Sequence, residues 1–166
     1  MNQSIASLVQ TLSGLLEKSS IKIALAESCT GGLLAAHLTA QAGSSLWFDR
    51  GFVTYSNASK TESIGVLSSI IEQYGAVSEE VAKAMAQGAL NHSAAKTSIA
   101  ITGIAGPGGS TENKPVGMVC FAWAVQFPGS PALLIASTQI FDGGRQAIRE
   151  HACAYALNEL IQILRK

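Results

Sequence analysis

A short polar segment, ESCTGG at residues 27–32, follows the apolar run IKIALA and precedes a stretch rich in Leu and Ala. A buried strand followed by a helix would place this joint at the carboxyl edge of a sheet, where α/β proteins bind ligands. At this edge the Ser28 hydroxyl is a candidate nucleophile for acyl transfer. Backbone amides near the helix start could hold an oxyanion. The residues assigned to this oxyanion or substrate-binding role are Glu27, Cys29, Thr30, Gly31 and Gly32.

Two other interpretations of this segment remain open. Ser28 or Thr30 could be the N-cap of the following helix, with the glycines permitting a tight turn. Cys29 lies beside Ser28, near the same helix start, and is the rival nucleophile. Cys120 and Cys153 fall in apolar patterns that are typical of small core residues.

The segment GFVTYSNASK at residues 51–60 supplies a candidate base for that nucleophile. Lys60 can accept the Ser28 proton only if burial lowers its pKa from about 10.4 toward neutrality. Tyr55 could relay this proton, and Asn57 is a further candidate for binding the substrate. Taken alone, a lysine in this pattern is typical of a solvated helix residue, and the tyrosine of a packing residue.

A glycine-rich segment, ITGIAGPGGSTENKPVG at residues 101–117, follows another apolar run. Glycines let backbone amides approach a phosphate closely, and neighbouring hydroxyls can add donors. The segment matches neither a P-loop nor a dinucleotide fingerprint, and a flexible loop without a ligand is the alternative. We expect phosphate to bind here with help from a cationic side chain; the residues assigned are Thr102, Gly103, Gly106, Gly108, Gly109, Ser110 and Arg145.

Apolar periodicity predicts the elements that must position these segments. Helical spacing occurs at residues 5–16, 31–42, 78–93 and 143–165, and strand-like runs occur at 21–26, 48–56, 97–106, 116–127 and 132–141. The last two strands are separated by PGSP, which favours an antiparallel hairpin. This order predicts an α/β fold: a single domain over residues 1–166, with three α/β/α layers and a mixed sheet that ends in the hairpin.

Composition excludes several classes of protein. The 11 basic and 11 acidic residues give zero net charge without a basic stripe, so we expect neither nucleic acid nor a membrane as partner. Three widely spaced cysteines and histidines without metal-ligand spacing favour a reduced, cytoplasmic protein with no metal and no cofactor. Because 48% of the residues are hydrophobic and only 13% are charged, we expect a homo-oligomer such as a dimer.

Four motifs occur in one order along the chain: ESCTGG at 27–32, YSNASK at 55–60, AVSEEVA at 76–82 and TGIAGPGGSTENKPVG at 102–117. In these motifs, and over nearly its whole length, the sequence resembles the C-terminal domain family of competence/damage-inducible protein A, CinA. Resemblance to its stand-alone members implies hydrolysis of the carboxamide of nicotinamide mononucleotide. The products would be nicotinic acid mononucleotide and ammonia, in pyridine nucleotide salvage.

The resemblance also implies roles for particular residues. The family's proposed nucleophile falls on Ser28, and its Tyr and Lys partners fall on Tyr55 and Lys60. The family often has Gly-Asp-Arg where this chain has GGR at residues 143–145, so the acidic side chain is missing here. Because one fold can host several functions, a non-catalytic nucleotide-binding or interaction module and an amidase for another substrate stay open as alternatives.

Overall fold

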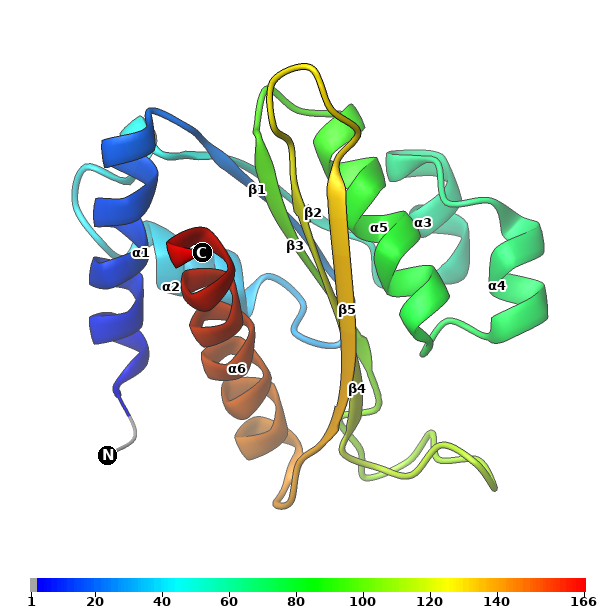
Figure 1. Ribbon diagram of the computed structural model, residues 1–166. Coiled ribbons are helices and arrows are strands. Elements are labelled where there is room, and N and C mark those ends of the chain that lie inside the picture. Colours follow the sequence, from blue (N-terminus) through cyan, green and yellow to red (C-terminus); the bar gives the residue numbers. More distant parts are fainter. Residues whose placement is uncertain (1–2) are drawn as a thin grey trace.

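The computed structural model describes residues 3–166 and has a five-stranded mixed sheet at its centre (Figure 1). The strands are β1 (Ile23–Glu27), β2 (Phe48–Val53), β3 (Thr97–Gly103), β4 (Met118–Val125) and β5 (Leu133–Ile140), in the spatial order β2-β1-β3-β4-β5. β1 pairs in parallel with β2 and β3, whereas β3 with β4 and β4 with β5 pair antiparallel. The mixed sheet and its final hairpin are confirmed; residues 1 and 2 of the predicted domain lie outside the described residues.

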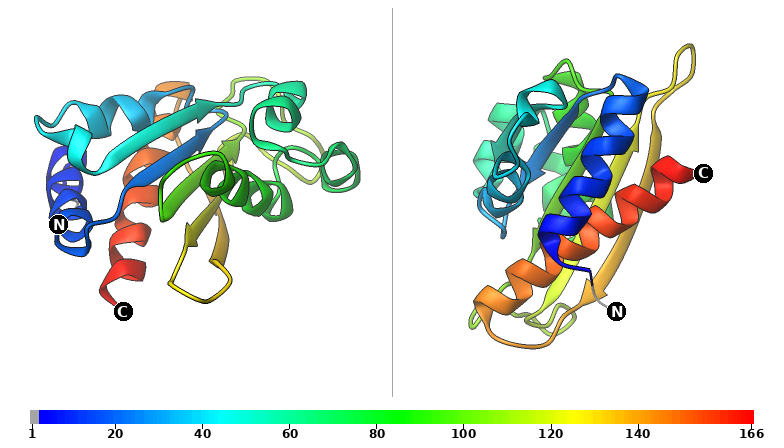
Figure 2. Two further views of the ribbon diagram at one scale, coloured as in Figure 1. Left: turned by 90° about the horizontal axis from the view of Figure 1, so that it is seen from above. Right: turned by 90° about the vertical axis from the view of Figure 1, so that its left-hand side faces the viewer.

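Helices cover both faces of the sheet and make the three predicted layers (Figure 1 and Figure 2). One layer contains α1 (Ile5–Ser19), α2 (Leu33–Thr39) and α6 (Arg145–Arg165). The other contains α3 (Asn57–Ile64), α4 (Ser68–Tyr74) and α5 (Glu79–Asn91). A short 3-10 helix, η1 (Ser44–Leu46), leads into β2. Across the described part of the chain, every helix is too short or too polar to span a membrane.

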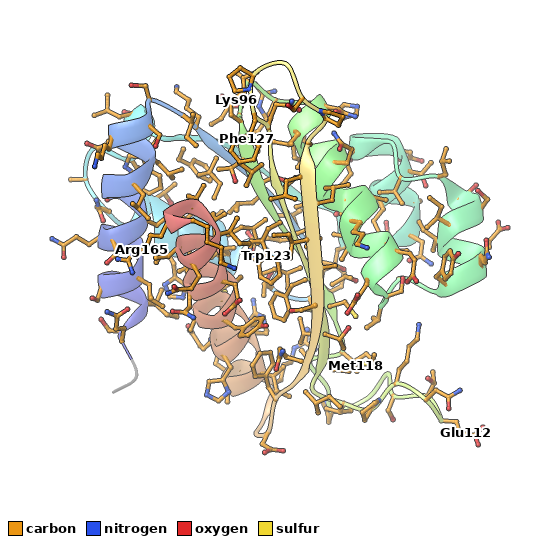
Figure 3. The ribbon with its side chains drawn as sticks, in the orientation of Figure 1. Lys96, Glu112, Met118, Trp123, Phe127 and Arg165 are labelled. Carbon is orange, nitrogen blue, oxygen red and sulfur yellow. The ribbon has the colours of Figure 1, made fainter. Side chains whose placement is uncertain are left out.

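The two faces of the sheet carry side chains of different size, because successive strand residues point to opposite faces. Large side chains such as Phe121 face the layer of α1, α2 and α6. Trp123 lies between β4 and α6 (Figure 3), where its indole N–H donates to the Ala156 carbonyl at 3.0 Å. The opposite face is lined by alanines such as Ala100, which let α5 approach the strands closely. Packing on both faces thereby fixes the strands that carry the predicted site.

The three parallel strands end at one edge of the sheet, and the three predicted site segments follow them there. β1 continues into the ESCTGG turn, β2 into α3, and β3 into the glycine-rich segment. The connection from β1 to β2 runs over one face through α2, whereas the connection from β2 to β3 runs over the other through α3, α4 and α5. Open α/β sheets bind ligands at such a switch point, where the connections from two neighbouring strands run over opposite faces of the sheet.

Two helices differ from the prediction. α2 begins at Leu33 rather than at residue 31, because Gly31 and Gly32 have positive φ angles of 56° and 98°. Residues 28–32 therefore form a turn that precedes the helix. The apolar pattern does not predict α4, because this seven-residue helix buries only Ile71 and is too short to show a helical period.

Candidate active site

A cavity of about 290 Å³ opens at the carboxyl edge of the parallel strands. Its wall brings together residues from all three predicted segments: Ser28, Cys29, Tyr55, Asn57, Lys60, Thr102, Gly103, Gly106, Gly108, Gly109 and Arg145. Ala76, Val77, Ile104 and Ala105 add an apolar part. No Asp or Glu is among these wall residues, and the guanidinium of Arg145 gives the cavity a positive charge at its open side.

Lys60 reaches Ser28 directly. Its Nζ lies 3.1 Å from Ser28 Oγ and donates to the Thr54 carbonyl at 2.8 Å. The Tyr55 carbonyl lies 3.5 Å from both Lys60 Nζ and Ser28 Oγ. Lys60 is only 1% exposed and Ser28 is 9% exposed. The predicted nucleophile and base therefore meet in a position that is nearly closed to water.

The environment of Lys60 favours a neutral amine. Among residues 3–166 no carboxylate forms an ion pair with it, and burial lowers the pKa of its ammonium below the ordinary lysine value. A neutral amine has two N–H groups and one lone pair. The N–H groups can serve the Thr54 and Tyr55 carbonyls, which leaves the lone pair to accept the Ser28 proton.

The start of α3 places Lys60 next to these carbonyls. Ser56 is the N-cap of α3, and its Oγ accepts the Ser59 amide at 3.1 Å. The Lys60 amide donates to the Ser56 carbonyl, so this residue lies in the first turn of the helix. Because helical side chains point toward the N-terminus, the lysine extends back toward the end of β2. The N-cap at Ser56 therefore fixes the helix start from which the side chain of the candidate base extends.

The joint between β1 and α2 is held by Glu27. Its buried carboxylate accepts the Leu34 amide at 2.9 Å and the Ala35 amide at 3.1 Å. Both carboxylate oxygens of Glu27, which was assigned to substrate binding, thereby cap α2, and the residue lies outside the cavity wall. The N-cap interpretation of Ser28 and Thr30 is wrong: Gly32 is the N-cap and makes no side-chain hydrogen bond.

The turn at residues 28–31 leaves two amides unbonded beside the candidate nucleophile. The Ser28 amide donates to the Ile101 carbonyl at 2.9 Å, and the Gly31 amide donates to the Ser28 carbonyl at 3.0 Å. Of the described hydrogen bonds, none uses the amides of Cys29 or Thr30. The Gly32 amide, one residue beyond this turn, is also unused by the described hydrogen bonds, and the N–H groups of Cys29 and Thr30 are the candidate oxyanion donors that follow Ser28 directly in the chain.

Other residues assigned to the turn have structural roles. Gly31 and Gly32 lie outside the cavity wall, and their positive φ angles allow the chain to turn before α2. The Thr30 side chain is fully buried and also lies outside the wall, where its Oγ1 has no partner within the described residues. Any part that Thr30 plays in binding is therefore limited to its backbone.

Cys29 is a poor rival to Ser28. Burial raises the pKa of its thiol to about 11, so the thiol keeps its proton at neutral pH. The thiolate, rather than the thiol, is the reactive nucleophile of cysteine. Ser28, in contrast, has the Lys60 amine within hydrogen-bond reach.

The hydroxyl and the carbonyl of Tyr55 contact different groups of the site. Its side chain is 59% exposed, and its hydroxyl accepts a hydrogen bond from Arg145 Nη2 at 3.1 Å. The predicted proton relay through this hydroxyl is not required for that contact, because Lys60 reaches Ser28 without an intermediary. Only the backbone carbonyl of Tyr55 lies close to both groups.

Within the glycine-rich segment, Gly106, Gly108 and Gly109 line the cavity. The Gly106 carbonyl accepts Arg145 Nη1 at 2.9 Å, which links α6 to this wall. A Cβ added to Gly108 would meet no heavy atom within 4 Å, so the chain itself does not require glycine there. Close approach by a ligand remains a reason for a glycine at this position.

Three assignments in this segment change with the structure. Gly103 is required by packing, because an added Cβ would lie 2.8 Å from the Val119 side chain. The Thr102 hydroxyl donates to the Ala76 carbonyl at 2.8 Å, so its proton is not free for a phosphate. Ser110 is exposed and lies outside the cavity wall.

Arg149 is a residue that the sequence interpretation missed. Its Nε donates to the Cys29 carbonyl at 3.2 Å, and its Nη2 donates to the Thr30 carbonyl at 2.9 Å. The available signal was its spacing from Arg145, because residues four apart lie on one face of a helix.

Comparison with known proteins places the chain among relatives over most of its length. The family profile of the CinA C-terminal domain matches residues 5–164. A CinA-like protein of Mycolicibacterium paratuberculosis is 52% identical over 143 residues, which cover 86% of this chain and 33% of that protein. The nicotinamide-nucleotide amidohydrolase PncC of Escherichia coli (strain K12) is 49% identical over 140 residues, which cover 84% of this chain and 82% of that protein.

The fold is shared with a solved relative. The crystal structure of a competence/damage inducible protein from Agrobacterium tumefaciens has a TM-score of 0.89 and 40% identity, with 100% of both chains covered. The present chain spans about a third of the length of the CinA-like proteins that it matches, and most of the length of the PncC proteins. From the profile match and these identities, the chain belongs to the CinA C-terminal domain family.

Proposed function

We propose that this chain is an amidohydrolase that converts nicotinamide mononucleotide to nicotinic acid mononucleotide and ammonia. Relatives that are 42–49% identical carry the name nicotinamide-nucleotide amidohydrolase. The observation that carries the proposal is the buried Lys60 amine, which has no carboxylate partner within residues 3–166 and lies 3.1 Å from Ser28 Oγ. Burial of an unpaired lysine costs stability, and a protein that only binds ligands gains nothing from it.

Acylation begins when Ser28 Oγ attacks the carboxamide carbon and Lys60 Nζ takes the hydroxyl proton. A C–O bond forms, and the carbonyl electron pair moves to oxygen, where the free amides of Cys29 and Thr30 are suited to receive it. As the carbonyl re-forms, the C–N bond breaks. Lys60 returns its proton to the departing nitrogen, and ammonia leaves.

Deacylation repeats these steps with water. A water molecule in the place of ammonia gives a proton to Lys60 and attacks the acyl carbon. Collapse of the second tetrahedral intermediate breaks the bond between carbon and Ser28 Oγ, and Lys60 returns the proton to this oxygen. The product is a carboxylic acid, which ionises, and the serine and the neutral amine are restored.

The glycine-rich wall is suited to hold the 5′-phosphate. Arg145 uses Nη1 and Nη2 on the Gly106 carbonyl and the Tyr55 hydroxyl, and its five N–H groups leave further donors for an anion. The exposed backbone at Gly108 and Gly109 lies in the same wall. An anionic substrate would therefore anchor at the open side while its carboxamide enters the buried side.

The decisive experiment measures ammonia release from a panel of amides. The panel contains nicotinamide mononucleotide, nicotinamide riboside, free nicotinamide, asparagine and glutamine. We expect release from the mononucleotide, with one nicotinic acid mononucleotide formed per ammonia, and an acyl adduct at Ser28 in quenched samples. Binding of the mononucleotide without ammonia would identify a non-catalytic nucleotide-binding module. A higher kcat/KM for another amide would identify a different amidase.

A further inference from the structure

The first turns of α6 contact two sides of the cavity through two arginines: the glycine-rich segment and the turn that carries Ser28. Arg145 donates to the glycine-rich wall and to the Tyr55 hydroxyl, as described above. Arg149, one helical turn later, instead contacts the turn that carries Ser28. Its side chain lies outside the cavity wall, so it is placed to act on the backbone of the turn rather than on a ligand.

Arg149 fixes two consecutive carbonyls of this turn. Nε donates to the Cys29 carbonyl at 3.2 Å and Nη2 donates to the Thr30 carbonyl at 2.9 Å, while Nη1 donates to the Gln146 side chain at 3.0 Å. A guanidinium is planar and rigid, so two such bonds hold the two peptide groups in a fixed relative orientation.

These carbonyls control the direction of the free amides. In a trans peptide the C=O and the following N–H point in opposite directions, and the peptides of this turn are trans. Binding of the Cys29 carbonyl therefore turns the Thr30 N–H away from Arg149. Binding of the Thr30 carbonyl holds the Gly31 N–H on the Ser28 carbonyl at 3.0 Å, and that carbonyl shares its peptide with the Cys29 N–H.

We propose that Arg149 is a positioning residue that orients and polarises the Cys29 and Thr30 amides as the oxyanion donors for Ser28. The inference rests on the proposed function, because it assigns a role within the same acyl transfer. Its positive charge beside the Cys29 carbonyl draws electron density from that peptide and makes the Thr30 N–H a stronger donor. At the Thr30 carbonyl the same charge strengthens the Gly31 N–H, and its bond to the Ser28 carbonyl passes the polarisation on to the Cys29 N–H. The oxyanion exists only in the transition state and intermediate, so the effect falls on kcat and leaves KM nearly unchanged.

The test compares Arg149→Met and Arg149→Lys with Arg50→Met as the matched control. Arg50 also donates to a backbone carbonyl, that of His92 at 3.1 Å, but lies outside the cavity wall. Two readouts are used: kcat and KM for nicotinamide mononucleotide, and the rate at which a fluorophosphonate probe labels Ser28. In that labelling, Ser28 Oγ forms a bond to phosphorus, fluoride leaves, and the phosphonyl oxygen requires the same donors as the oxyanion.

We expect Arg149→Met to lower kcat about 10- to 100-fold, with KM within about threefold of the parent. Ser28 labelling should slow by a similar factor in protein with the parent circular dichroism spectrum. Arg149→Lys should recover part of both rates, because an ammonium can serve one carbonyl. The Arg50 variant should match the parent.

Parent-like kcat and labelling in folded Arg149→Met would overturn the inference, as would a rise in KM with unchanged kcat. Should the methionine variant not fold, Arg149→Lys decides, because parent-level kcat and labelling in that variant also overturn it. A parent that leaves the mononucleotide intact but labels at Ser28, with slower labelling in the variants, would refute the proposed function and support the role of Arg149. A parent that does not label at Ser28 would refute both.

Discussion

The two walls of the cavity differ in how far water reaches their functional groups. Ser28 and Lys60 are 9% and 1% exposed, and backbone hydrogen bonds hold the turn and the helix start that carry them. The opposite wall continues into residues 107–113, which are all exposed. Burial lowers the pKa of Lys60 and so favours its neutral amine, whereas an open, glycine-rich backbone suits an anion that keeps part of its hydration. We infer that the buried wall performs the chemistry and the open wall selects the substrate.

The largest effect is expected from Ser28→Ala on the buried wall. Loss of the nucleophile should reduce kcat by at least about 1,000-fold, because the acyl-enzyme no longer forms. Affinity for nicotinamide mononucleotide, measured by calorimetry, should stay within about threefold, because binding relies on the other wall. A variant that retains more than about a tenth of the parent kcat would exclude Ser28 as the nucleophile. An adduct found on Cys29 by mass spectrometry would transfer the role to that thiol.

Lys60→Arg should be nearly as harmful as Lys60→Met, and we expect each to lower kcat by at least about 100-fold. A guanidinium stays protonated at any working pH and cannot accept the Ser28 proton. The measurement is kcat for both variants in protein shown to be folded. If the arginine variant kept near-parent activity, the lysine would act only through its positive charge.

The pH dependence follows from the lowered pKa of Lys60. The base is neutral only above that pKa, so kcat/KM should fall as the pH drops through it and level off above it, at a pH below that of ordinary lysine titration. Between the folded and unfolded pKa values the unfolded chain binds more protons, so the free energy of unfolding should rise with pH in that window. In Lys60→Met, the free energy of unfolding measured by urea titration should no longer rise with pH in that window. A kcat/KM that rises only at the pH of ordinary lysine titration, with chemistry rate-limiting, would contradict the assignment.

On the open wall, removal of the substrate's phosphate should have the next largest effect. Two or three charge-assisted hydrogen bonds of about 1.5 to 3 kcal/mol each would contribute roughly 3 to 9 kcal/mol. When the substrate has no phosphate, water can bond to the same donors, so the loss of binding free energy should lie at the low end of this range. We therefore expect kcat/KM for nicotinamide riboside to be at least about 100-fold below that for the mononucleotide.

Gly108→Val sharpens this test, because a Cβ added at this position meets no heavy atom of the described chain within 4 Å. The variant should lose much of the phosphate-dependent rate and leave riboside turnover unchanged. The two proteins and the two substrates together form a double-mutant cycle that measures the coupling between the phosphate and the loop. Gly14→Val on α1 is the control, because its Cβ also meets nothing within 4 Å. Equal turnover of riboside and mononucleotide by the parent would show that the open wall does not hold phosphate.

The comparison of the walls also shows what could be predicted from sequence. Apolar runs and glycines indicated the strands, the hairpin and the three site segments, because alternation and turn chemistry are local properties. The direct contact between Ser28 and Lys60, by contrast, depends on β2 lying beside β1. Strand order is a property of the folded chain, and no pattern within residues 51–60 specifies it.

Residues that act through another element were the ones missed or misassigned. Glu27 caps a helix that begins six residues later, and Arg149 reaches a turn 119 residues away in sequence. Neither distance matches a local capping or pairing motif. Tyr55 was assigned to the proton path from its position in the motif, whereas its side chain points to Arg145 at the mouth of the cavity.

The smallest predicted effect tests Gly144, the residue before Arg145. Gly144 is the N-cap of α6, with φ −78° and ψ 173°, and makes no side-chain hydrogen bond. Gly144→Asp and Gly144→Asn should each raise the free energy of unfolding by about 0.5 kcal/mol, because their side chains can accept hydrogen bonds from the free amides of the first turn. The aspartate also places a negative charge beside Arg145 and the open wall. At low salt KM for the mononucleotide should therefore rise roughly twofold in Gly144→Asp alone, and the rise should vanish at about 1 M salt. A KM that rises equally in both variants would assign the effect to the shape of the N-cap, and a rise that persists in salt would indicate direct competition for Arg145.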